Sequence, residues 1–140
     1  MVSDAQNRVS VAVGLRTSFE MAPHRQLAAW QCAREVVAIV LRLSRSAWKP
    51  HLSAVFAQLQ RSSLSVQLNI AEGYASGRTR RCRYFLEIAY ASAMETDDLL
   101  QVLADEAILA PEEATVAIET CRRSQALIKG LIRRYPARPT

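Results

Sequence analysis

Hydrophobic positions recur along the chain at spacings of three and four residues, which is the period of an amphipathic α-helix. The pattern predicts four helices, over residues 26–46, 51–74, 80–109 and 111–134. Pro50 and the Ser76-Gly77 pair separate the first three helices, and Pro111 is suited to the first turn of the fourth. No segment shows the strict alternation of a β-strand. The chain is therefore predicted to be all-α, an antiparallel up-down four-helix bundle.

We expect the bundle to occupy residues 25–135, with an N-terminal tail at 1–24 and a C-terminal tail at 136–140. The apolar stripe of the third helix is predicted along Phe85, Ile88, Ser92, Glu95, Leu99, Val102 and Glu106. The second helix carries, beside its apolar stripe, a line of small and polar residues: Ser62, Ser65, Asn69 and Gly73. Small side chains let another backbone approach closely, so this line predicts a tight helix contact.

Composition narrows the class of protein without indicating an activity. The chain has 140 residues, of which 50% are hydrophobic and 22% charged, as in an ordinary single globular domain. No apolar run is long enough for a transmembrane helix, and the N-terminus lacks a secretory signal pattern. The three cysteines, Cys32, Cys82 and Cys121, are widely spaced and contain no CxxC pair, which predicts reduced thiols and a cytoplasmic protein.

Charge is strongly segregated along the chain. Residues 1–83 carry a net charge of +8, residues 84–121 carry −9, and residues 122–140 carry +6. Of the 18 basic residues 16 are arginine, whose planar guanidinium binds phosphate or carboxylate in a bidentate manner. This pattern favours contact with nucleic acid or charge-matched self-association, and solvated helix faces are the alternative.

The third helix carries charges that oppose its own dipole. It begins with Arg80, Arg81 and Arg83 and ends with Asp105 and Glu106. Each such exposed charge costs about 0.3–1 kcal/mol. We expect a partner or a function to compensate for this local conflict.

A long motif lies in the second helix. Residues 58–73 read QLQRSSLSVQLNIAEG and match every fixed position of Q-L-x-R-(A/S)-(A/S)-x-S-(I/V)-x-x-N-I-A-E-G. Residues 85–95 match F-L-x-I-A-x-G-S-x-x-E, with Ala91 in place of the glycine, and Trp30-Gln31-x-Ala33 lies upstream in register. Over about residues 27–110 the chain thus resembles the bacterial 23S rRNA intervening-sequence proteins. It departs from them at the corner between the second and third helices, which is more basic here.

The resemblance implies a compact four-helix bundle that assembles as a homopentamer and whose role is largely unassigned. A related group assists the reverse transcriptase of diversity-generating retroelements by binding nucleic acid and enzyme. The implied function is therefore binding or scaffolding, and we expect no enzyme activity, no cofactor and no metal. Neither His24 nor His51 has the Glu-x-x-His spacing of a di-iron bundle, and no GxSxG or phosphate-binding glycine loop occurs.

Two groups of candidate residues follow. The arginines expected to neutralise phosphates are Arg78, Arg80, Arg81, Arg83, Arg122, Arg123, Arg133 and Arg134. The residues expected to form a polar network that fixes bundle register, or a subunit interface, are Arg61, Asn69, Glu72, Gly73, Ser92 and Glu95. A ligand site built from members of this second group is the alternative. Because Glu95 lies on the predicted apolar stripe, it needs a partner, and Arg61 is the natural candidate.

The leading hypothesis is a cytoplasmic homo-oligomer, pentameric by resemblance, that binds structured RNA or a nucleoprotein partner through arginine-rich surfaces. The alternative is a protein-interaction module, for example an accessory protein of a retroelement reverse transcriptase, that makes no direct contact with nucleic acid. In that case the arginines serve protein contacts only.

Overall fold

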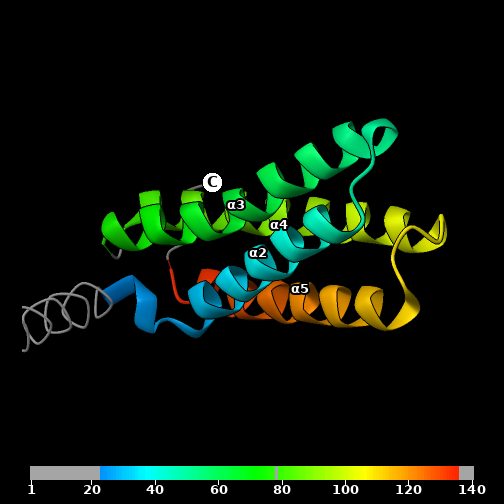
Figure 1. The fold of residues 1–140 in the computed structure, drawn as a ribbon. Helices are drawn as coiled ribbons and strands as arrows, with labels where there is room; N and C mark the ends of the chain where they lie inside the picture. Colours follow the sequence, from blue (N-terminus) through cyan, green and yellow to red (C-terminus); the bar gives the residue numbers. More distant parts are fainter. Residues whose placement is uncertain (1–22, 78, 136–140) are drawn as a thin grey trace, which may run out of the picture.

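The computed structural model describes residues 23–77 and 79–135, and its four long helices pack side by side (Figure 1). Two short 3-10 helices precede the first two long ones. The elements are η1 (Pro23–Gln26), α2 (Ala28–Ser46), η2 (Pro50–Leu52), α3 (Ser53–Ala75), α4 (Arg80–Asp105) and α5 (Pro111–Ile132). No strand occurs in these ranges, so the all-α prediction is confirmed. The expected tails, apart from Pro23 and His24, lie outside the described residues.

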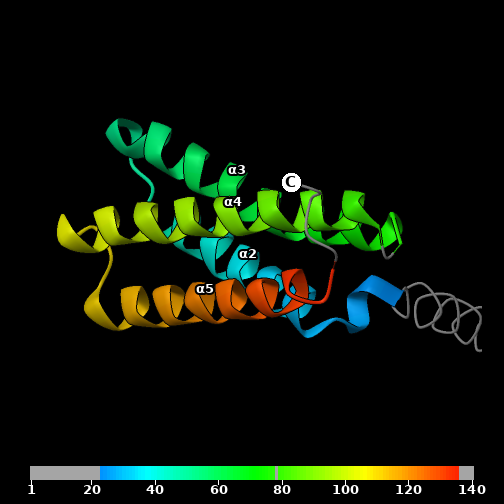
Figure 2. The ribbon, with the colours of Figure 1, turned by 180° about the vertical axis from the view of Figure 1, so that it is seen from behind.

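Successive long helices run in opposite directions, as Figure 1 and the reverse view in Figure 2 show. The helices in contact are α2 with α3, α3 with α4, α4 with α5, and α5 with α2, so the four close into a ring. This is the expected antiparallel up-down arrangement. As a consequence, the beginnings of α2 and α4 lie at the same end of the bundle as the last turns of α3 and α5.

The helix α4 ends at Asp105, four residues before the predicted end at Leu109. Ala107 has a positive φ of 55°, which reverses the chain direction. The amide of Ile108 donates to the carbonyl oxygen of Leu103 at 2.9 Å, and the amide of Ala107 donates to that of Ala104 at 3.0 Å. These two bonds form a Schellman motif with alanine in the position that glycine usually occupies.

The core consists of two hydrophobic clusters, one toward each end of the bundle. The first contains Val36, Ile39, Val40, Leu43, Phe56, Leu59, Leu100, Leu103, Leu109, Ala114, Ala117 and Cys121. The second contains Ala29, Trp30, Ala33, Val66, Ile70, Cys82, Leu86, Ala89, Ala93 and Ile128. Every long helix contributes to both clusters, which is why the chain forms one unit.

The stripe predicted to be the core face of α4 was wrong. The buried residues of α4 are Cys82, Leu86, Ala89, Ala93, Thr96, Asp97, Leu100 and Leu103. In the predicted stripe, Glu95 is exposed and Val102 is 47% exposed, while Ile88 and Leu99 are half-buried. The helix is apolar around much of its circumference, so periodicity alone does not identify the core face. Small residues such as Ala89 and Ala93 turn inward because they let the four helices approach closely.

Candidate nucleic-acid interface

Arginines are concentrated in η1, at the beginning of α4 and at the end of α5. Figure 1 shows that these segments lie at the same end of the bundle. We call this region the basic end and define it by Arg25, Arg80, Arg81, Arg83, Arg133 and Arg134. Among the described residues, the acidic side chains at this end are Glu72, near the end of α3, and Glu87, near the beginning of α4. The two basic segments are separated in the chain by the acidic stretch 84–121. The antiparallel topology brings them together because α4 begins where α5 ends.

Arg83 has several contacts within the protein. Its Nη1 donates to the carbonyl oxygen of Tyr135 at 3.0 Å and to that of Ile132 at 3.5 Å. Its Nε donates to Glu87 Oε1 at 3.0 Å. A positive charge is favourable beside the last carbonyls of a helix, so Arg83 compensates at α5 for its unfavourable place in α4. Because its guanidinium already has these partners, we do not count it among the phosphate-binding residues.

Four of the predicted arginines are exposed at the basic end: Arg80, Arg81, Arg133 and Arg134. Within the described ranges none of them forms an ion pair. Arg81 lies over the ring of Phe85, at 5.6 Å from its guanidinium carbon to the ring centroid. Guanidinium groups that lack carboxylate partners and remain exposed are suited to phosphate oxygens.

Arg25 is a further member of the basic end, and the charge pattern of the sequence does not indicate it. Its guanidinium carbon lies 4.9 Å from the centroid of the Trp30 ring, in a cation–π contact. In an up-down bundle, a residue just before the first helix lies beside the end of the second helix. The position of Arg25 at this end therefore follows from the topology and does not follow from the charge pattern alone.

Arg122 and Arg123 lie along the bundle and have acidic partners. Arg122 Nε donates to Asp97 Oδ2 at 3.1 Å, and Arg123 Nη2 donates to Glu35 Oε2 at 2.8 Å. Gln125 also donates to Asp97 Oδ2, at 3.0 Å. The structure thus separates these two arginines from the basic end. The remaining candidate, Arg78, lies outside the described residues.

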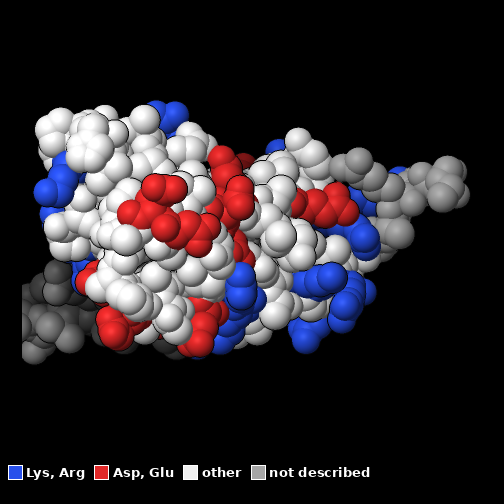
Figure 3. All heavy atoms as spheres, turned by 90° about the vertical axis from the view of Figure 1, so that its right-hand side faces the viewer, with Lys and Arg blue, Asp and Glu red and all other residues white. Residues whose placement is uncertain are grey.

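The opposite end of the bundle, where α4 ends and α5 begins, carries acidic side chains. They include Asp105, Glu106, Glu112 and Glu113. Figure 3 faces this end and shows a central group of acidic side chains, with Lys and Arg at its margins. The two ends therefore differ: arginines outnumber acidic residues at the basic end, whereas this end carries a group of acidic side chains.

Three members of the predicted polar network lie where α3 packs on α4. Ser92 Oγ lies 2.8 Å from Ser65 Oγ, and Asn69 Nδ2 donates to the Ser65 carbonyl oxygen at 2.8 Å. Gly73 lies so close to α4 that an added Cβ would be 3.2 Å from the carbonyl oxygen of Cys82. A further hydroxyl pair, Ser62 and Thr96, joins the same two helices at 2.9 Å. The predicted line of small residues is thus the α3–α4 contact.

The other three members of that group are exposed and do not form one site. Glu95 Oε1 accepts a hydrogen bond from Gln58 Nε2 at 2.7 Å, so the structure pairs Glu95 with Gln58 instead of Arg61. Arg61 and Glu72 are exposed on the outer side of α3. Leu64 and Leu68 lie on the same side and are 39% and 58% exposed. The motif therefore has an inner line that packs on α4 and an outer line that faces solvent.

The cysteines are buried within the bundle. Burial, assisted by the charge of Asp97, raises the pKa of Cys121 to about 12, and burial also raises the pKa of Cys82. Thiols with raised pKa values are poor nucleophiles at neutral pH. In the ranges that the structure describes, no three His, Cys, Asp or Glu side chains form a group that could hold a metal ion. Nor is any described helix long and apolar enough to cross a membrane.

Comparisons with known proteins agree with this architecture. The sequence model of the family described as 23S rRNA-intervening sequence protein matches residues 25–130. A crystal structure from Bacteroides thetaiotaomicron VPI-5482, of a protein with unknown function from the S23 ribosomal protein family, superimposes with a TM-score of 0.68. The two chains are 18% identical, and the match covers 75% of this chain and 98% of the other, which shows the shared fold. No curated protein matches the chain.

Proposed function

The chain belongs to the 23S rRNA-intervening sequence protein family, and from that premise we propose that it is a cytoplasmic, non-catalytic scaffold that holds structured RNA at its basic end. The observation that carries this proposal is the group of exposed arginines at the α4 and α5 termini, for which the described part of the chain provides no acidic partner. These side chains come from two helices and would contact phosphates on two sides of a bound RNA. The fold holds them on helix ends, so little ordering would be needed on binding.

Electrostatics defines what this surface would recognise. Arginine contacts to phosphate release counterions, so affinity falls as salt rises, by about 0.7–0.9 in log–log slope per phosphate neutralised. Arg80, Arg81, Arg133 and Arg134 supply four guanidinium groups for such contacts. Phosphate contacts position a nucleic acid without reading its sequence. The proposal is therefore recognition of RNA shape and charge.

We also propose that the scaffold is a homo-oligomer, and the family resemblance implies a pentamer. The support in this chain is the outer side of α3, where Leu64 and Leu68 are exposed. Large apolar side chains grouped on a helix surface are typical of interaction sites. A ring of subunits that buried them would multiply the basic ends available to one RNA.

The same apolar surface supports the alternative function, a protein-interaction module that assists a nucleic-acid-processing enzyme and does not touch RNA itself. In that case the exposed leucines would bind the partner protein. The arginines of the basic end would serve contacts with acidic protein surfaces. The two functions differ in whether the purified protein binds RNA.

The test is a titration of a fluorescent structured RNA at several salt concentrations. In one variant Arg80, Arg81, Arg133 and Arg134 are all replaced by alanine. In a matched control the same change is made at four exposed basic residues elsewhere: Arg34, Arg42, Arg45 and Lys49. Both variants lose the same charge. We expect the first to lose affinity about tenfold or more and to show a shallower salt slope, while the control stays near wild type.

Equal losses in the two variants would show that net charge, and not the basic end, governs binding. No binding by the wild-type protein would favour the protein-interaction module. Light scattering on the same samples measures the assembly. Leu64→Ser with Leu68→Ser is expected to reduce the mass of the oligomer, and an unchanged mass would refute the proposed interface.

A further inference from the structure

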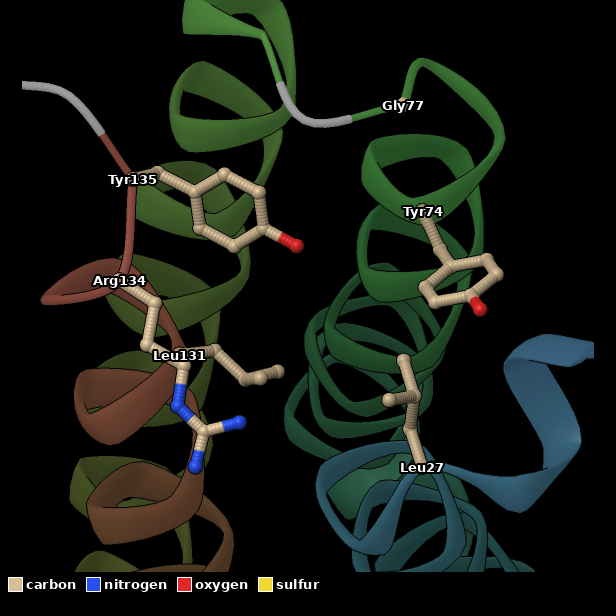
Figure 4. A pocket seen from close by; sticks show the side chains of 6 residues that line it. All are labelled: Leu27, Tyr74, Gly77, Leu131, Arg134 and Tyr135. Atoms are coloured by element: carbon tan, nitrogen blue, oxygen red, sulfur yellow. The ribbon is translucent and has the colours of Figure 1, made fainter.

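A cavity of about 450 Å³ opens at the basic end, between the last turns of α3 and α5 (Figure 4). The residues that line it are Leu27, Tyr74, Gly77, Leu131, Arg134 and Tyr135. In Figure 4 the Tyr135 ring points from the end of α5 toward α3, the Tyr74 ring lies along α3 on the other side of the opening, and Leu27 and Leu131 lie below the two rings. The Arg134 side chain runs along the same opening. The volume lies within the range of about 300–1,000 Å³ that is typical of small-ligand sites.

The walls of the cavity are held in place by the fold. The carbonyl oxygen of Tyr135 accepts a hydrogen bond from Arg83. The side chain of Tyr135 packs against the second core cluster. Tyr74 lies in the last turn of α3 and is 41% exposed. Gly77 follows with a φ of +72° and has no heavy atom within 4 Å of a Cβ added to it, so the turn leaves this rim open. The cavity is thus formed by the fold itself: Tyr135 is fixed on one side, Tyr74 is accessible on the other, and the edge at Gly77 is open.

The chemistry of the lining selects one class of ligand. Two phenol rings and two leucines favour a flat, aromatic group, because stacking on aromatic side chains and burial of apolar surface both stabilise it. Arg134 favours an anion beside that group, and none of the lining residues within the described ranges is acidic. A nucleotide combines both features, because it joins a flat aromatic base to a phosphate through a sugar.

We propose that this cavity holds one unpaired nucleotide of a bound RNA, with its base against Tyr74 and Tyr135 and its phosphate on Arg134. This inference rests on the function proposed above and deepens it. A base inside a duplex is stacked between its neighbours and does not reach such a cavity, whereas a base in a loop or bulge does. Arg80, Arg81 and Arg133 at the same end would hold the flanking phosphates. The protein would thus prefer RNA with an unpaired base over a perfect duplex.

The experiment compares two RNAs with equal numbers of phosphates, a hairpin with an unpaired adenine in its loop and a fully paired duplex. The loop adenine is replaced by 2-aminopurine, whose fluorescence falls when it stacks on an aromatic ring. In the test variant Tyr74→Leu, the ring is lost but an apolar side chain remains. Tyr74→Phe keeps the ring, and Tyr84→Leu removes another exposed tyrosine of the same end that does not line the cavity. Circular dichroism and unfolding midpoints verify that each variant is folded.

We expect the wild type to bind the hairpin about tenfold more tightly than the duplex and to quench 2-aminopurine. Tyr74→Leu should lose that preference and the quenching, while its affinity for the duplex and its salt slope stay unchanged. Tyr74→Phe and Tyr84→Leu should behave like the wild type.

Three results would overturn the inference. If the wild type binds both RNAs equally and Tyr74→Leu changes nothing, the cavity assignment fails while the proposed function stands. If the wild type binds neither RNA, the proposed function itself fails. If adenosine monophosphate binds in a Tyr74-dependent manner but the two RNAs are not discriminated, the occupant is a free nucleotide rather than part of an RNA.

Discussion

The guanidinium Nη1 of Arg83 and the carbonyl oxygen of Tyr135 lie 3.0 Å apart, joining the beginning of α4 to the end of α5. Within α4 alone, this arginine opposes the helix dipole. At the end of α5 it donates to the carbonyl oxygens of Ile132 and Tyr135, where a positive charge is favourable. The contact also fixes the backbone of a residue that lines the cavity at the basic end. One side chain thus links the stability of the bundle to the shape of its candidate site.

Replacement of Arg83 by alanine is expected to lower the free energy of unfolding by about 1–2 kcal/mol, because charge-assisted bonds to two carbonyl groups are lost. Urea denaturation monitored by circular dichroism measures this change. Arg80→Ala is the matched control, since Arg80 is exposed and has no ion pair among the described residues. It should stay within about 0.5 kcal/mol of wild type. Equal effects of the two replacements would show that Arg83 has no capping role.

Two glycines in helices should respond in opposite directions to the same replacement. In Gly73→Ala the new Cβ would lie 3.2 Å from the Cys82 carbonyl oxygen and 3.3 Å from Phe85 Cβ, so α3 and α4 must separate. We expect a loss of about 1–3 kcal/mol in the free energy of unfolding. Gly130→Ala meets no heavy atom within 4 Å and should gain about 0.5–1 kcal/mol from helix propensity. A gain of stability in Gly73→Ala would contradict the close packing of α3 on α4.

The turn after α4 predicts a stabilising replacement. Ala107 has a φ of 55°, in the left-handed region that costs alanine about 1–2 kcal/mol and glycine little. Ala107→Gly should therefore raise the thermal unfolding midpoint, with a gain of about 1 kcal/mol. Ala91→Gly, at an exposed position inside α4, should lower stability by about the same amount. If both replacements destabilise the protein, the left-handed conformation at Ala107 is wrong.

The buried Cys121 predicts a loss of stability at alkaline pH. Its pKa is raised from 9.0 to about 12 by burial and by the charge of Asp97, so the unfolded chain releases this proton at lower pH than the folded protein. The resulting stability is fully present below the unfolded pKa and is lost as the pH rises toward the folded pKa. The free energy of unfolding, measured in urea at a series of pH values, should decline over this window.

The control for this prediction is Cys121→Ala, which removes the titrating thiol. Its stability should decline less steeply with pH over the same range. A thiol reagent such as Ellman's reagent should also react slowly with Cys121 in the folded protein and rapidly after denaturation. If the free energy of unfolding depends on pH in the same way in the wild type and in Cys121→Ala, the Cys121 thiol is not the cause of the alkaline loss of stability.

Local signals in the sequence were sufficient for the helices themselves. Periodicity located all four, and Pro111 fixed the start of α5. The end of α4 was missed because the turn there uses Ala107, and alanine gives no sign of a left-handed residue. The core face of α4 was missed because apolar residues surround most of that helix. At the core face of α4 the deciding contacts come from residues distant in the chain.

The candidate site also has some features that follow from the sequence and others that follow only from the tertiary structure. The sequence by itself determined the family motif, the all-α class and the presence of two arginine-rich segments separated by an acidic one. Only the tertiary structure decided which arginines act together, because antiparallel packing brings Arg80 and Arg81 to the end where Arg133 and Arg134 lie, while Arg122 and Arg123 meet carboxylates along the bundle. The cavity between Tyr74 and Tyr135 likewise exists only in three dimensions, because helix period is a local property and the meeting of helix ends depends on the whole chain.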